Sequence, residues 1–437
     1  MESELEQVLP GTVGARTPFG KSLLLYMVIV TVLMTLAPFR FSWPSHPRVV
    51  WSGDLHDLIC NVLLFMPLGF LLELSISGSM SRWHLRALLF GFLLSSAIEG
   101  LQLFLPGRVT SFSDVVTNSL GAWVGAFLHE KAERNVRGRL LGKLTLELPL
   151  SILFYLVGAL LWVNALAARD ESARLWLGTL LGVIGAIILA ALWIHRVGPV
   201  ANIPRGSVHL AVGGWFLLGS LPAVVEDPSI VFISMLFAVG VAELLVRYPS
   251  ILGAAPGKRF EIPTLIRIAP LYLLFLGLLT YWPLQHMGSI GYWEGELGLN
   301  ELMDIPGEVP VLQLMEYITA YSILGYMVAQ ARGRRAESTP RSLLVVLVVS
   351  LCVGGGLELL RGYHPHHHAS LVRLILLCGS GVFGGFIYRS QLETVREILR
   401  TQKPREQPKP KAPPPVIRGG LRRRAVPPPL TDLPPKL

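Results

Sequence analysis

The sequence is poor in charge, in cysteine and in recognisable cofactor motifs. Only 15% of its 437 residues are Asp, Glu, Lys or Arg, against about 25% in an average soluble domain. Its three cysteines, Cys60, Cys352 and Cys378, lie within apolar runs, so no disulfide framework is expected. The glycines at 354–356 lack the Lys-Ser/Thr of a phosphate-binding loop, and no haem ligand pair is found. An ordinary soluble domain is therefore excluded, and no cofactor is expected.

Apolar runs of about twenty residues, by contrast, recur along most of the chain. A helix of that length crosses the hydrocarbon core of a bilayer. The sequence therefore predicts an all-α fold, a polytopic transmembrane helical bundle whose first partner is the lipid bilayer. About twelve spans are expected, at 22–38, 54–75, 84–105, 111–129, 144–166, 175–194, 207–225, 229–246, 265–283, 309–330, 342–360 and 369–389.

Lysine and arginine are divided unevenly between alternate loops of this bundle. One set of loops holds sixteen of them and the other set holds six. Cytoplasmic loops carry the excess in membrane proteins, so both termini are predicted in the cytoplasm, including an N-terminal segment at 1–21. The net charge of +9 then reflects topology, and no nucleic-acid partner is expected. Residues 401–437 are rich in proline and arginine and are predicted to be a disordered cytoplasmic tail.

Polar side chains gather near the predicted outer ends of the second, third and fourth spans. Spacings of three and four place them on one face of each helix. Ionisable groups near a bilayer are costly and tend to face a protein interior or a ligand. The two candidate general acid/base residues are Glu99 and Asp114. The candidate ligand-binding residues are Arg108, suited to phosphate or carboxylate, with Asn61, Gln102, Asn118, Asp57 and Ser111.

These residues also carry a resemblance to a known family. The segments DLICNVLLFMPLGFLLE (57–73) and SSAIEGLQLFLPGRVTSFSDVVTNSLGAWVGAFL (95–128) resemble the VanZ-like family of bacterial membrane proteins. The resemblance covers about residues 22–130 and implies a multi-pass protein of the bacterial plasma (inner) membrane. Because the family is named for a protein associated with resistance to the glycopeptide teicoplanin, it also implies an envelope role. It implies no particular reaction.

A second, altered copy of the pattern is predicted at 265–390. Aligning Glu358 with Glu99 also aligns Ser370 with Ser111, without a gap. The polar positions differ, since Arg361, His367, Arg373 and Leu377 replace Gln102, Arg108, Asp114 and Asn118. We therefore expect two parallel four-helix repeats, at 22–130 and 265–390, on either side of a middle four-helix segment at 144–247. Glu358 is expected to pair with Arg361 or Arg373.

The stretch GYHPHHHAS (362–370) raises the question of a metal site. Adjacent histidines cannot all point at one ion, and no nearby Cys or Asp completes a familiar spacing. An external loop over His364–His368, without a dedicated metal site, is the preferred interpretation.

Three functions fit the sequence. The favoured one is an outward-facing polar site that recognises or modifies an envelope molecule, such as a lipid-linked cell-wall or polysaccharide precursor, with a link to glycopeptide resistance. A twelve-span transporter and a non-enzymatic component of an envelope complex are the alternatives. A purely structural lock, in which Glu99, Arg108 and Asp114 neutralise one another, also stays open. The sequence leaves the enzymatic activity and the oligomeric state undecided.

Overall fold

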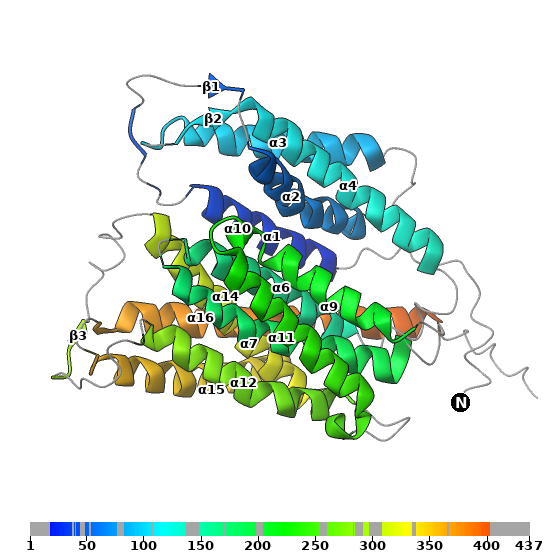
Figure 1. The fold of residues 1–437 in the computed structure, drawn as a ribbon, viewed down its shortest axis with the longest axis vertical. Coiled ribbons are helices and arrows are strands. Elements are labelled where there is room, and N and C mark those ends of the chain that lie inside the picture. Colours follow the sequence, from blue (N-terminus) through cyan, green and yellow to red (C-terminus); the bar gives the residue numbers. More distant parts are fainter. Residues whose placement is uncertain are drawn as a thin grey trace, which may run out of the picture.

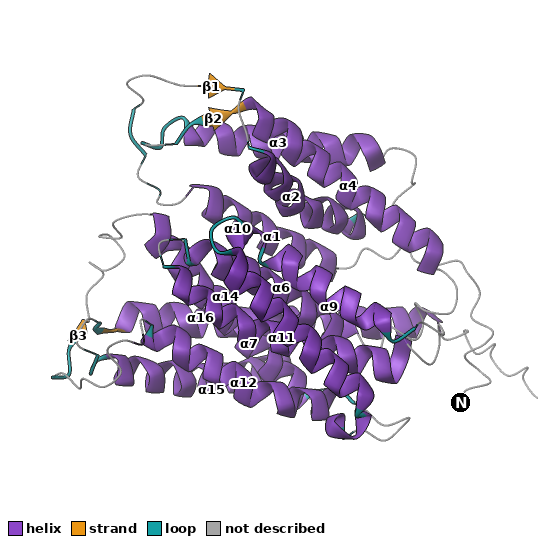
Figure 2. Ribbon diagram, viewed as in Figure 1, coloured by secondary structure: helices purple, strands orange, loops and turns teal. Residues whose placement is uncertain are grey.

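The protein is almost entirely helical in a computed structural model (Figures 1 and 2). The structure describes residues 18–36, 39, 41–43, 49–51, 54–76, 83–106, 108–136, 148–169, 171–197, 204–253, 260–282, 284, 292–296, 308–333, 338–364 and 367–402. Most of the expected N-terminal segment and nearly all of the expected tail at 401–437 lie outside these residues.

Each of the twelve apolar runs coincides with one long helix. They are α1 (Pro18–Leu36), α2 (Leu55–Ser75), α3 (Trp83–Gln102), α4 (Phe112–Val136), α6 (Leu148–Ala167), α7 (Trp176–Leu192), α9 (Gly206–Gly219), α11 (Pro228–Arg247), α12 (Glu261–Tyr281), α14 (Glu308–Arg332), α15 (Thr339–Arg361) and α16 (Leu371–Gln402). Short elements join them: η2 (Ser172–Leu175), η3 (Trp193–Val197), α10 (Leu221–Val224) and η4 (Pro249–Leu252).

Nine helices of the described chain are long and apolar enough to cross a membrane. The other three long helices fall short for different reasons. Helix α9 has only 14 residues, the first turns of α4 carry polar side chains such as Asp114 and Asn118, and Leu23–Leu36 is the apolar stretch described for α1. The protein is therefore a helical bundle of membrane-protein type, and the count of twelve spans stays a prediction.

Helices α2, α3 and α4 form one group, which meets the rest of the bundle through α1 (Figure 1). Glycine allows α2 and α4 to approach very closely. A Cβ atom at Gly69 would collide with the backbone carbonyl of Ala122, and one at Gly125 would collide with that of Met66. The small residues of α4 therefore face α2, so that the two helix backbones come into direct contact.

Similar close contacts occur in the group formed by α14, α15 and α16. A Cβ atom at Gly325 would meet the carbonyl of Gly381, and one at Gly384 would meet that of Ser322. A short parallel strand pair accompanies each group. Strand β1 (Val49–Val50) pairs with β2 (Thr110–Ser111), and β3 (Gly295–Glu296) pairs with β4 (Ala369–Ser370). Both pairs hold an extended segment against the residues that enter the last helix of their group.

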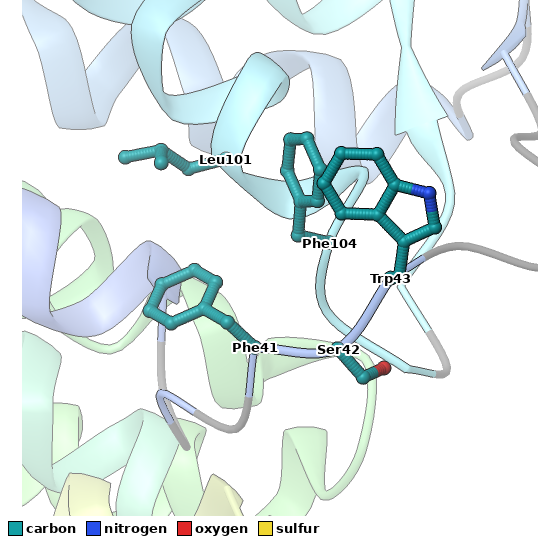
Figure 3. A pocket seen from close by; sticks show the side chains of 5 residues that line it. All are labelled: Phe41, Ser42, Trp43, Leu101 and Phe104. Carbon is teal, nitrogen blue, oxygen red and sulfur yellow. The ribbon is translucent and has the colours of Figure 1, made fainter.

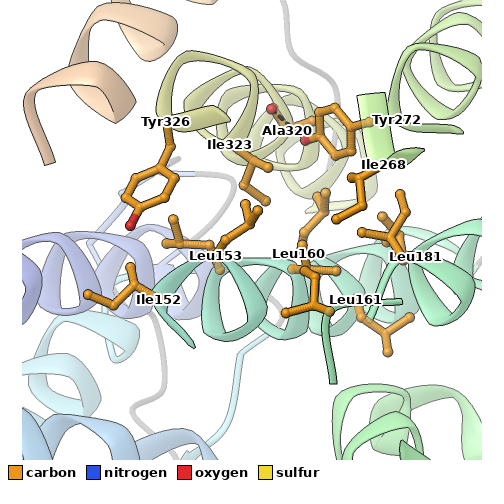
Figure 4. Close-up of a cluster of buried hydrophobic side chains, with 14 of the residues drawn as sticks. Ile152, Leu153, Leu160, Leu161, Leu181, Ile268, Tyr272, Ala320, Ile323 and Tyr326 are labelled. Carbon is orange, nitrogen blue, oxygen red and sulfur yellow. Dashed lines mark hydrogen bonds between the residues drawn. The ribbon is translucent and has the colours of Figure 1, made fainter. Parts of the chain in front are cut away.

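The largest core lies where α6 and α7 meet α12 and α14 (Figure 4). It is built from leucine and isoleucine side chains such as Leu153, Leu160 and Ile268, which are almost fully buried. Some buried tyrosines of this core have hydrogen-bonded hydroxyls, whereas those of Tyr155 and Tyr321 have no partner among the described residues. Tyr272 donates to the carbonyl of Ala320 at 2.6 Å. Because a buried hydroxyl without a partner is costly, this hydrogen bond lets the core accommodate Tyr272.

Candidate functional site

Glu99 lies at the C-terminal end of α3 and reaches across to the start of α4. Its side chain is only 5% exposed. The carboxylate Oε2 accepts a hydrogen bond from the backbone N–H of Ser111 at 2.9 Å, and Thr110 Oγ1 donates to the backbone oxygen of Glu99 at 3.2 Å. A carboxylate close to a helix N-terminus is stabilised by the free N–H groups there. Glu99 therefore fixes the turn that joins the two helices.

Asp114 lies in the first turn of α4, beside the same serine. Its carboxylate is hydrogen-bonded to the side chains of Ser111, Asn61 and Ser113. The hydroxyls of Ser111 and Ser113 are themselves 2.5 Å apart. Ser111 thus contacts Glu99 through its backbone and Asp114 through its hydroxyl. The structure brings both predicted carboxylates into one network with residues from α2, α3 and α4.

Arg108 supplies positive charge to this network. It is half-buried in the turn between α3 and β2, and both its charge and that of Asp114 act on Glu99. Two acidic groups and one guanidinium therefore share a small volume at the end of the helix group. Charges in such partly buried positions interact more strongly than in water.

Asn118 extends the network one turn further along α4. Its amide Nδ2 donates to Ser95 Oγ on α3 at 2.9 Å, and both residues are buried. Its Oδ1 is buried and has no hydrogen-bond partner among the described residues. A buried acceptor without a donor is costly, so this atom is a candidate contact for a ligand or a water molecule.

Two predicted site residues point elsewhere. Gln102 donates through Nε2 to the backbone oxygen of Thr35 at 2.9 Å and so ties α3 to α1. The side chain of Asp57 is 69% exposed and lies 3.7 Å from His56 Nδ1. Asp57 still acts electrostatically on Asp114. Both residues therefore border the network instead of forming its centre.

Two residues that contact the predicted site residues, Ser113 and Thr35, were not predicted from the sequence. Ser113 could have been found as the second hydroxyl of the Ser-x-Ser-Asp stretch, because it immediately precedes Asp114. Thr35 contributes only its backbone oxygen, which every residue possesses. No side-chain pattern could therefore have identified it.

An open apolar groove lies at the C-terminal end of α3 (Figure 3). Leu101 and Phe104 of the α3 end line one side, and Phe41, Ser42 and Trp43 from the segment after α1 line the other. The rings of Trp43 and Phe104 are 5.5 Å apart, and the Ser42 N–H donates to the Phe104 carbonyl at 2.7 Å. The groove has a volume of about 340 Å³ and an almost wholly apolar lining. Leu101, which lines the groove, directly precedes Gln102 in α3.

A second polar centre, between α6, η2 and α14, was not predicted at all. Glu316 of α14 accepts from Arg174 of η2 and from Asn164 of α6, each at 2.7 Å. Glu316 is fully buried and Arg174 is 4% exposed. This pair joins the middle segment to the last helix group. Elsewhere in the described part of the chain, no three His, Cys, Asp or Glu side chains are arranged to hold a metal ion.

Comparison with known proteins finds a family match for the segment that carries the network. Residues 16–130 match the VanZ/LLP1 family model. This segment is VanZ-like. A curated relative, Protein VanZ of Enterococcus faecium, is 24% identical over 108 residues. The aligned part is 24% of this chain and 64% of the relative, so the chain spans less than two thirds of that protein. No solved structure matches the chain.

The family match confirms the resemblance found in the sequence. The VanZ-like segment includes helices α1 to α3 and most of α4. All of the network, from Asn61 to Asn118, lies within it, and so does the apolar groove. We therefore place the candidate functional site in this VanZ-like segment.

Proposed function

We propose that the VanZ-like segment recognises or modifies a lipid-linked cell-wall or polysaccharide molecule at the outer face of the bacterial plasma membrane. One observation carries the proposal: Ser111 contacts both Glu99 and Asp114, while the charge of Arg108 acts on Glu99. A simple helix lock needs one acid and one base. Here two acids share hydroxyl and amide partners, which is typical of a site that handles a polar ligand.

The chemistry of each residue fits this role. Arg108 presents a planar guanidinium, which binds phosphate or carboxylate through two parallel hydrogen bonds. Glu99 or Asp114 acts as general acid/base if a bond is broken, since each can exchange a proton with a bound hydroxyl. Asn61 and Asn118 orient the ligand, and the unpaired Oδ1 of Asn118 accepts one of its hydrogen bonds.

The groove beside the network favours an amphipathic ligand. Its aromatic and leucine walls suit a hydrocarbon chain, while the polar network suits the head of the same molecule. The bias of lysine and arginine between loops supports an outward-facing site with both termini in the cytoplasm. A link to glycopeptide resistance follows from the family name and is part of the proposal.

A transporter is the second candidate. Its substrate site would be expected near the middle of the membrane-spanning helices. The network instead lies where α3 ends and α4 begins. We therefore rank transport below recognition at the surface. A non-enzymatic role within an envelope complex is compatible with the same binding site. We also propose that the α12–α16 region arose as a second copy, with the altered polar positions.

Lipid analysis of the purified full chain tests the proposal. The protein is isolated from bacterial cells in a mild detergent, and bound lipids are quantified by mass spectrometry. We expect lipid-linked envelope precursors with the unchanged chain and at least about a tenfold loss with Asp114→Asn, which removes the charge at constant shape. Glu393→Gln, at an exposed position of α16, is the matched control.

Equal amounts of precursor in all three proteins, each folded, would overturn the proposal. So would a wild-type protein that carries bulk phospholipid alone. Loss of folded protein with Asp114→Asn would instead support a structural lock. Uptake of a solute by reconstituted protein, abolished by the same change, would favour the transporter.

A further inference from the structure

A second charged cluster lies at the end of α15 and the start of α16, outside the VanZ-like segment. Glu358 Oε2 accepts from the backbone N–H of Ser370 at 3.0 Å, as Glu99 accepts from Ser111. Arg373 Nη1 lies 3.8 Å from Glu358 Oε1. The predicted pairing of Glu358 with an arginine is thus confirmed, and Arg373 is the partner. Arg361 makes no such pair.

Arg361 is held by an aromatic side chain instead of a carboxylate. Its Nη1 donates to the hydroxyl of Tyr317 at 3.1 Å, and its guanidinium carbon stands 5.8 Å from the centre of the same ring. The Tyr317 hydroxyl in turn donates to the Leu279 carbonyl at 2.8 Å. The Nε of Arg361 is buried without a hydrogen-bond partner in the described part of the chain. The guanidinium is therefore fixed in place, while its Nε–H group makes no hydrogen bond to the described residues.

The histidine beside Arg361 does not offset its charge. His367 Nε2 donates to the Trp282 carbonyl at 2.9 Å, and Nδ1 faces Arg361 Nη2 at 3.5 Å. Burial and the positive charge of Arg361 lower the pKa of His367 to about 4. The imidazole is neutral at pH 7. Among the side chains that the structure describes here, two guanidinium groups face the carboxylate of Glu358, and the side chain of Glu294, next to β3, is exposed.

We propose that Arg361, with Arg373 behind it, binds a small anionic group, a phosphate or a carboxylate, at this end of the bundle. An arginine held by a tyrosine through Nη1 can still offer its remaining N–H groups to such an anion. The corresponding positions of the VanZ-like segment carry Gln102 and Asp114, so the two places differ in sign of charge. The inference does not depend on the function proposed for the first site. The anion is either a soluble ion or the headgroup of an acidic lipid.

Binding to the purified full chain tests this. The protein is placed in nanodiscs of zwitterionic lipid and titrated with inorganic phosphate by equilibrium dialysis. In a second arm, phosphatidylglycerol is added to the nanodiscs and retained lipid is counted by native mass spectrometry. We expect binding in at least one arm. Binding in the first arm identifies a soluble ion, and binding in the second alone identifies a headgroup.

Matched variants assign the binding to this cluster. Arg361→Gln should weaken it at least about tenfold, whereas Arg341→Gln, at the other end of α15, should leave it unchanged. Arg361→Lys keeps the positive charge but not the planar guanidinium, and it should retain part of the binding. This variant provides a second test of the site if Arg361→Gln fails to fold. Glu393→Gln, at an exposed position of α16, should bind the anion normally. No binding in either arm, or equal binding by Arg361→Gln, would overturn the inference.

Discussion

Breaking the buried ion pair between Arg174 and Glu316 should destabilise the protein more than any change at the polar network. The two charged groups are 2.7 Å apart, and their side chains are 4% and 0% exposed. In Arg174→Met the carboxylate of Glu316 keeps only the amide of Asn164, at 2.7 Å. An uncompensated charge then remains in a site closed to water. Removal of one partner of such a pair costs about 3–5 kcal/mol.

Replacing both partners should cost much less. In the double variant Arg174→Met with Glu316→Met no charge is left buried, and apolar side chains fill a similar volume. Substitutions of this kind are often neutral or stabilising by about 1–4 kcal/mol. The structure therefore predicts a strongly non-additive double-mutant cycle, in which the second change recovers most of the loss caused by the first.

Unfolding of the purified protein in mixed micelles, titrated with a denaturing detergent, measures this cycle. The free energy of unfolding is compared for the wild type, both single variants and the double variant. Additive losses, with the double variant the least stable, would refute the reasoning, because they would mean that the two side chains do not share one buried interaction. A loss below about 1 kcal/mol in Arg174→Met, the size expected at an exposed pair, would refute it equally.

Three further predictions follow from other parts of the molecule. Gly125→Ala should lower the unfolding free energy by about 1–3 kcal/mol, because its Cβ would meet the α2 backbone. Gly100→Ala, with open space around it, should lower it by less than about 0.5 kcal/mol in the same assay. The pKa of His367 is lower in the folded protein than in the unfolded chain, so its contribution to stability is full above pH 6.5 and is lost as the pH falls toward about 4. His367→Gln should therefore flatten the dependence of the unfolding free energy on pH between these values. An unchanged pH dependence would count against the assignment. Reporter fusions at residue 335 should report the cytoplasm and fusions at residue 295 the outside, and the reverse pattern would contradict the predicted topology.

The sequence predicted the helices well because their signal is local. Each apolar run is long enough to be read without knowledge of its neighbours, and each one coincides with a helix. The close packing of α4 was also accessible, since glycines spaced four apart at Gly121 and Gly125 indicate a face that approaches a neighbouring helix, although the spacing does not indicate that this neighbour is α2. The three-residue and four-residue spacings placed Asp114 and Asn118 on that same face.

Contacts between distant residues could not be predicted in the same way. Arg174 and Glu316 are 142 positions apart, and neither lies in a motif. Gln102 belongs to the polar stripe by spacing, yet its amide binds the backbone of Thr35, because α1 packs against that side of α3. Asp57 shares a face with Asn61, but it lies in the first turn of α2, where its side chain remains exposed. Local spacing identifies a face, and tertiary packing decides what that face contacts.

Photo-crosslinking in living cells tests the central claim, that the VanZ-like segment holds an envelope lipid between its apolar groove and its polar network. A diazirine-bearing amino acid is placed at Leu101, in the wall of the groove, or at Leu210, a control position on α9 that is 80% exposed. After illumination, the adducts are identified by mass spectrometry. The account predicts a lipid-linked envelope precursor at Leu101, bulk phospholipid alone at Leu210, and loss of the precursor adduct when Asp114→Asn is added. The same bulk phospholipid at both positions, unaffected by Asp114→Asn, would contradict it.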